Sequence, residues 1–170
     1  MSAANRNIYK RRHSAASEPR TSGKYPRSVF REQPNHKKSE NGTADERRLE
    51  LDRITESIIG CAYKVSNTLG AGFVEKVYEN ALAIELRKAG FRTEQQHPIR
   101  VRYDGAIVGE FTADLLVEGM IIVELKAVKA FDEVHSAQCM NYLRATGLPV
   151  CLLINFGKPK AEVKRIVQGF

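Results

Sequence analysis

The sequence predicts an α/β domain over residues 49–170, with two helices followed by a three-stranded antiparallel meander, a helix and further strands in a mixed sheet. Three observations lead to this prediction. Residues 49–89 carry apolar side chains at helical spacings of three and four. Residues 99–128 change to the alternating, β-branched pattern of strands. The chain then returns to helical spacing before a continuous apolar run at 150–155, which indicates a buried strand.

The first predicted helix spans residues 49–69, because its apolar positions recur as an amphipathic helix requires and Gly70 and Gly72 end it. The second predicted helix spans residues 75–89, with Gly90 placed as its C-terminal cap. Both helices precede the sheet in the chain.

The first predicted strand, residues 99–103, runs into an Asp-Gly turn signal. The next two runs, 107–117 and 120–128, flank a Glu-Gly pair, so three antiparallel strands in a meander are the economical interpretation. Residues 131–146 then fit a helix that a Gly-Leu-Pro segment stops, and residues 162–167 fit either an edge strand or a short helix.

The composition is that of a soluble globular domain joined to a basic tail. Of 170 residues, 42% are hydrophobic and 28% charged, and the net charge is +7. Residues 1–48 hold 12 Lys and Arg against 5 Asp and Glu, whereas residues 49–170 hold 15 of each. We therefore predict a basic, disordered tail over 1–48. The favoured interpretation is a solvated tail without function or an incorrectly assigned start codon. A cationic arm that adds salt-dependent phosphate contacts is the alternative.

The sequence predicts a cytoplasmic protein without a membrane partner. No apolar run approaches the ~18 residues that span a bilayer, and the N-terminus lacks the apolar segment of a secretory signal. Cys61, Cys139 and Cys151 have no CxxC spacing, so we expect reduced, buried thiols.

Three charged residues stand inside the predicted strands. Asp114 lies in an apolar run, where an unpaired carboxylate would be costly to bury. Glu124 and Lys126 lie two residues apart on the next strand and so point to one face. Two carboxylates to hold Mg²⁺ and a cation near the attacking water are what hydrolysis of a phosphodiester needs. A cross-strand ion pair on a solvated sheet face is the alternative.

A geometric condition applies to this set. Asp114 and Glu124 share a face only if the connection around Glu118-Gly119 holds an odd number of residues or includes a bulge. A plain two-residue turn would separate the two carboxylates.

The spacing of Asp114 and Glu124-x-Lys126 resembles the core motif of the PD-(D/E)xK nuclease superfamily, although Thr-Ala-Asp stands here in place of Pro-Asp. The resemblance covers about residues 50–170 and implies a restriction-endonuclease-like core. It also implies that Asp114 and Glu124 bind Mg²⁺ or Mn²⁺, and that Lys126 positions the attacking water or stabilises the transition-state charge.

Two further motifs resemble branches of the same superfamily. Gln138 and Tyr142, four apart on one helical face, resemble the QxxxY element of RecB-type exonucleases. They would act in catalysis and bind substrate by holding phosphate or ordering Lys126, with polar packing between helix and sheet as the alternative. The segment 72–78, Gly-Phe-Val-Glu-Lys-Val-Tyr, resembles the signature of the bacterial GxxExxY proteins.

The GxxExxY resemblance adds two residues to the predicted site. Glu75 would join the metal site directly or through water, whereas the alternative is an exposed carboxylate favoured by the start of a helix. Tyr78 would bind substrate or support Glu75, whereas the alternative is a half-buried ring that packs on the sheet.

The resemblance implies a Mg²⁺-dependent nuclease whose partner is nucleic acid, with DNA as the commonest substrate of the superfamily. A catalytically inactive binding or interaction module with the nuclease fold is the alternative. The neutral balance of charge in residues 49–170 favours that alternative, because DNA-binding domains usually display positive surface.

Overall fold

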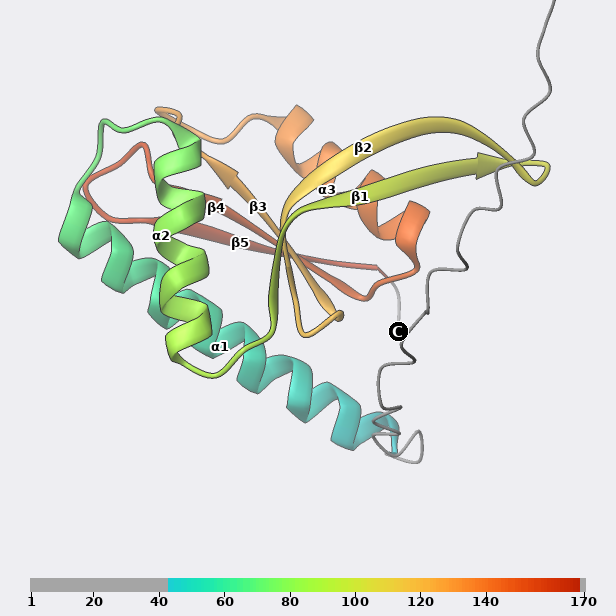
Figure 1. Cartoon of the computed structure of the whole chain (residues 1–170), viewed down its shortest axis with the longest axis horizontal. Helices are drawn as coiled ribbons and strands as arrows, with labels where there is room; N and C mark the ends of the chain where they lie inside the picture. The colour runs from blue at the N-terminus through green and yellow to red at the C-terminus, as the bar shows by residue number, and fades with distance from the viewer. Residues whose placement is uncertain (1–42, 169–170) are drawn as a thin grey trace, which may run out of the picture. The chain divides into compact units, whose positions relative to one another are not determined.

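The computed structural model describes residues 43–168 (Figure 1). In chain order, the elements of this part are α1 (Ala44–Leu69), α2 (Glu75–Lys88), β1 (Thr93–Tyr103), β2 (Ala106–Val117), β3 (Ile121–Lys126), α3 (Glu133–Thr146), β4 (Val150–Asn155) and β5 (Glu162–Val167). The predicted cationic tail lies outside the described residues, apart from 43–48. None of the helices between residues 43 and 168 combines the length and the apolar character of a membrane span.

The strands form one five-stranded sheet in the order β1-β2-β3-β4-β5. The predicted antiparallel meander of β1, β2 and β3 is confirmed, and the segment at 162–167 is a strand, β5, antiparallel to β4. Only the β3–β4 pair is parallel among these strands, and α3 supplies the crossover connection that a parallel pair requires. The sheet is therefore mixed, as predicted.

The helices cover both faces of the sheet, so the domain has two apolar cores. On one face α1 and α2 pack against the strands through residues such as Ile58, Leu82 and Val123. On the other face Leu143 of α3 packs against Ile122 and other strand residues. Every residue of β4 is buried, which explains why this strand is a continuous apolar run rather than an alternating one.

Two elements begin earlier than the apolar pattern predicts. Helix α1 begins at Ala44 rather than at residue 49, because Thr43 and Glu46 form a capping box. In that box Glu46 Oε2 accepts from Thr43 N–H at 2.7 Å, and Thr43 Oγ1 accepts from Glu46 N–H at 3.2 Å. Strand β1 begins at Thr93 rather than at residue 99, and its first residues are polar.

The β2–β3 connection meets the geometric condition set by the sequence. Val117 pairs with Ile121, so three residues connect the strands, and the last ladder pair is Leu115 with Val123. One further step in the same register brings Asp114 opposite Glu124. The two carboxylates therefore belong to the same end of the same strand pair.

Tyr78 fixes the loop between α1 and α2 and so fixes where α2 starts. Its side chain is fully buried and its ring stacks on Phe156, with ring centroids 4.6 Å apart and an interplanar angle of 3°. The hydroxyl donates to Gly70 O at 2.8 Å and accepts from Phe73 N–H at 3.2 Å. These bonds hold the loop that presents Glu75 at the start of α2.

Tyr78→Phe keeps the stacked ring and removes both hydroxyl bonds. We expect the free energy of unfolding to fall by roughly 1–3 kcal/mol, because the part-buried Phe73 N–H and Gly70 C=O both lose their partner. Urea denaturation measures this change. The control is Tyr103→Phe, in which the altered side chain is 76% exposed and a change below about 0.5 kcal/mol is expected. Equal effects of the two variants would contradict the structural role of the Tyr78 hydroxyl.

Candidate active site

Asp114 lies at the point where β2 and β3 separate. Beyond the last ladder pair, its carboxylate Oδ2 accepts the backbone N–H of Leu125 at 2.8 Å, as a backbone carbonyl would in a continuing ladder. Burial raises the pKa of Asp114, as do the nearby charges of Glu79 and Glu75, against the lowering effects of the Leu125 bond and of Lys126. The Asp114 carboxylate is thus held between the two strands in a region of negative charge.

Glu124 is buried and only half of its carboxylate is paired. Its Oε1 accepts from Lys126 Nζ at 2.8 Å, whereas its Oε2 is buried without a hydrogen-bond partner. Burial, followed by the charge of Asp114, raises the pKa of Glu124 to about 7. Burial lowers the pKa of Lys126, but the hydrogen bond and charge of Glu124 outweigh it, so that pKa lies above its ordinary value.

Glu75 contacts the same end of β3 from α2, on the face of the sheet that α1 and α2 cover. It is the first residue of α2, and its Oε1 accepts the backbone N–H of Ala127 at 3.2 Å. Its charge contributes to the raised pKa values of both Asp114 and Glu124, which places it within electrostatic reach of both. The start of α2 therefore contributes a third carboxylate to this region.

Gln138 and Tyr142 form a hydrogen-bonded pair on α3. Gln138 Nε2 donates to the Tyr142 hydroxyl at 2.7 Å, and that hydroxyl donates to Thr112 O at 3.3 Å, two residues before Asp114. Burial raises the pKa of Tyr142, the bond from Gln138 lowers it, and the charge of Glu124 raises it further. The structure thus brings this pair close to the carboxylates.

A groove of about 310 Å³ opens beside the Gln138–Tyr142 pair, between α3 and the β1–β2 hairpin. Its walls are mostly apolar, with amide and hydroxyl groups from α3. The lining residues are Ile99, Val101, Phe111, Val134, Ala137, Gln138, Asn141, Tyr142 and Ala145. Phe111 is 53% exposed, so its ring is available to a bound molecule.

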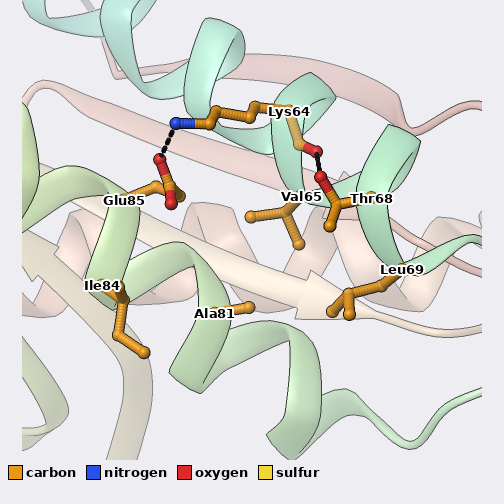
Figure 2. Close-up of a pocket in the computed structure, with 7 residues that line it drawn as sticks. All are labelled: Lys64, Val65, Thr68, Leu69, Ala81, Ile84 and Glu85. Carbon is orange, nitrogen blue, oxygen red and sulfur yellow. Dashed lines mark hydrogen bonds and ion pairs between the residues drawn. The ribbon is translucent and has the colours of Figure 1, made fainter.

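A second hollow lies between α1 and α2 and carries different chemistry (Figure 2). Lys64 and Glu85 form an ion pair across it at 2.5 Å, and the Thr68 hydroxyl donates to Lys64 O at 2.8 Å. Its remaining lining residues, Val65, Leu69, Ala81 and Ile84, are apolar. Since its polar groups are already paired, we assign this hollow to helix packing.

The contacts of Tyr78 are made with other residues than the carboxylates of the candidate site. Its hydroxyl is engaged by the α1–α2 loop and its ring by Phe156. This environment supports the packing alternative, and the substrate-binding role of Tyr78 stays a prediction.

Two buried polar residues near the site, Glu79 and Asn155, are not among the residues that the sequence predicts for it. Glu79 is 2% exposed, and its place four residues after Glu75, on the same helical face, was the available signal. Asn155 is fully buried at the end of β4. Its side chain accepts from Val128 N–H at 3.0 Å and donates to Val128 O at 2.8 Å, which ties down the segment after β3. In the sequence, the signal for Asn155 was a single amide residue at the end of an otherwise apolar strand.

The carboxylates at this site suit Mg²⁺ if only one or two of them bind the ion directly. Within residues 43–168, no three His, Cys, Asp or Glu side chains converge closely enough to hold a metal ion by themselves. Mg²⁺, however, is usually held by one or two carboxylates together with waters and substrate oxygens. The unpartnered Glu124 Oε2 beside the Asp114 carboxylate is the kind of oxygen pair that a divalent cation stabilises.

Glu124→Gln tests the raised pKa of Glu124. In the metal-free protein, folded Glu124 keeps its proton up to about pH 7, whereas the unfolded chain releases it near 4.5. The resulting stabilisation is complete below pH 4.5 and is lost as the pH rises through about 7. We expect the free energy of unfolding of the wild type to fall relative to Glu124→Gln by up to about 3 kcal/mol over this range.

Urea denaturation in EDTA at a series of pH values measures this difference. Glu56→Gln, which alters an exposed carboxylate of α1, is the matched control and should follow the wild type at every pH. Parallel pH profiles for the wild type and Glu124→Gln would show that the pKa of Glu124 is not raised.

Comparison with known proteins gives likenesses to solved structures and a family. A solved structure described as "Crystal structure of SSO0001" shares 17% sequence identity with a TM-score of 0.44, over 73% of this chain and 62% of that chain. The chain thus spans less than two thirds of that protein's length. Among curated proteins, no sequence gives a significant match.

The family follows from the sequence match and agrees with the fold. Residues 52–166 match the model of the PD-(D/E)XK nuclease superfamily. This segment runs from α1 to β5 and contains Asp114, Glu124 and Lys126. Three helices around a five-stranded mixed sheet form a restriction-endonuclease-like core. The chain therefore belongs to the PD-(D/E)XK nuclease superfamily.

Proposed function

We propose that this chain is a nuclease that hydrolyses phosphodiester bonds in DNA and uses Mg²⁺ or Mn²⁺ as its cofactor. The observation that carries the proposal is the half-buried Asp114 carboxylate next to the buried Glu124 carboxylate, with the Lys126 ammonium beside Glu124. Membership of the superfamily supports hydrolysis of nucleic acid as the reaction class. DNA is proposed because it is the commonest substrate of that superfamily.

Each side chain has a defined task in this proposal. Asp114 and Glu124 hold the metal ion through carboxylate oxygens, and Glu75 joins them directly or through water. A bound divalent ion supplies positive charge at the phosphate and makes the attacking water more acidic. Lys126, whose ammonium already points at Glu124, orients that water and stabilises the negative charge that develops on the phosphate.

Gln138 and Tyr142 are proposed as the substrate contacts. Their amide and hydroxyl line the groove between α3 and the β1–β2 hairpin, and the exposed Phe111 ring offers a surface on which a nucleobase can stack. The hydrogen bond between the two side chains supports assigning them to a QxxxY element. On this basis we propose that the chain belongs to the RecB-type branch, and the segment 72–78 supports its assignment to the GxxExxY group.

The cytoplasm is the proposed location of the activity. Cys61, Cys139 and Cys151 are all free thiols, and the latter two are buried. Unpaired cysteines of this kind suit a reducing compartment.

Lys126→Ala should abolish most cleavage while metal binding persists. Removing a cation that stabilises developing charge typically lowers the rate roughly 10²–10³-fold. Asp114→Asn should instead lose metal binding and cleavage together. Calorimetry with Mn²⁺, and assays with linear, circular and single-stranded DNA, measure the two properties. Lys129→Ala is the matched control, because this exposed lysine lies three residues beyond Lys126.

If the chain is a nuclease as proposed, the wild type binds Mg²⁺ or Mn²⁺ and cleaves at least one of these DNA forms. Failure of the wild type in both respects would refute the proposal. A wild type that binds DNA but does not cleave it would support the second candidate, an inactive interaction module. The equal numbers of acidic and basic residues in 49–170 are the observation that favours that candidate.

A further inference from the structure

Two neighbouring residues of β1 bind the same buried carboxylate. Gln95 Nε2 donates to Glu79 Oε1 at 3.0 Å, and Gln96 Nε2 donates to Glu79 Oε2 at 2.7 Å. Consecutive residues of a regular strand point to opposite faces of the sheet, so they cannot both reach one group. The backbone of β1 must therefore depart from regular geometry at this point.

Gln96 is the residue of β1 whose backbone departs from regular strand geometry. Its backbone φ is +54°, a left-handed conformation that residues other than Gly, Asn and Asp rarely adopt. It does not lie in a turn, because Gln95 pairs with Leu115 and His97 pairs with Ala113 on either side. In this register Gln96 faces Asp114, and that pair is absent from the ladder. The strained residue of β1 thus lies opposite the predicted metal ligand of β2.

Strand β2 changes its alternation at the same place. Ala113 packs in the core under α3, whereas Leu115 packs in the core under α1 and α2, although residues two apart normally share a face. The inward-facing set of β2 therefore switches at Asp114. At this switch Asp114 is absent from the ladder with β1, and its carboxylate accepts the Leu125 N–H of β3.

Stability alone does not explain the charge at Glu79. Its side chain is 3% exposed and is also paired with Lys76 Nζ at 2.7 Å. Its charge acts unfavourably on Asp114, whose pKa it helps to raise. A neutral residue would fill this position without that repulsion. Burying a charge here is explained if the carboxylate is needed to hold the Gln96 amide.

We propose that Glu79, acting through Gln96, is a positioning residue for Asp114. The Glu79 carboxylate holds the Gln96 amide and so maintains the irregular backbone of β1. That irregularity allows β2 to turn and to present the Asp114 carboxylate to β3. The consequence for metal binding rests on the proposed function, whereas the placement of Asp114 is a property of the metal-free chain.

The test compares Gln96→Ala with Gln95→Ala in the full-length protein. Both variants remove one amide from Glu79, but only Gln96 has the strained backbone. Hydrogen exchange at the Leu125 amide, followed by NMR without metal, reports the Asp114 bond directly. Gln96→Ala should speed this exchange about 10-fold or more, as expected on losing a charge-assisted hydrogen bond. Gln95→Ala should change it less than about 3-fold.

Calorimetry with Mn²⁺ gives the second readout. Gln96→Ala should weaken Mn²⁺ binding roughly 10–100-fold, the usual effect of losing a group that orients a ligand, and Gln95→Ala should leave it nearly unchanged. Glu79→Gln, which keeps the volume and removes the charge, should act in the same direction as Gln96→Ala. Circular dichroism establishes that each variant is folded.

The proposal is overturned if folded Gln96→Ala keeps the wild-type exchange rate at Leu125, or if Gln95→Ala speeds it equally. A wild type that binds no Mn²⁺ would refute the proposed function alone. The exchange comparison at Leu125 would still decide whether Glu79 positions Asp114.

Discussion

The hydrogen bond from the Leu125 N–H to the Asp114 carboxylate is the interaction on which the site depends. It lies where the β2–β3 ladder ends, and it satisfies a backbone donor that would otherwise be left unpaired in the interior. At the same time it fixes Asp114 opposite Glu124. One bond therefore completes the sheet and places the first carboxylate of the proposed metal site.

The charges around this bond repel one another in the chain without a metal ion. Asp114, Glu124 and Glu75 gather at one end of β3, and the pKa values of Asp114 and Glu124 rise as a result. Lys126 pairs with one oxygen of Glu124 and leaves the other without a partner. This group of carboxylates is unfavourable in the chain without a metal ion and becomes favourable around a bound cation. Binding sites commonly contain buried polar groups that core packing alone would not favour.

The sequence predicted the architecture and the central residues because these depend on local patterns. Strand alternation placed Glu124 and Lys126 on one face, and the three-residue connection from Val117 to Ile121 then brought Asp114 to the same place. The start of α1 was missed because residues 44–50 are exposed and have no buried face, although Thr43 and Glu46 carried the signal of a capping box.

Glu79 could not be assigned from the sequence because its partners come from a different element. The beginning of β1 is polar, since Gln95 and Gln96 bind a carboxylate on α2 instead of packing in a core. No short-range pattern records such a contact. The left-handed backbone at Gln96 is likewise visible only once β1 and β2 are paired, because Gln carries no turn signal of its own.

The central claim is that Asp114 and Glu124 hold one divalent ion between β2 and β3. Crystals of the full-length protein grown with Mn²⁺, measured for anomalous scattering, test it most directly. We expect an anomalous peak bonded to carboxylate oxygens of both residues, with the Glu124 oxygen that now lacks a partner among the ligands. An anomalous map with no peak between these two carboxylates, from crystals in which Asp114 and Glu124 are well ordered, would contradict it.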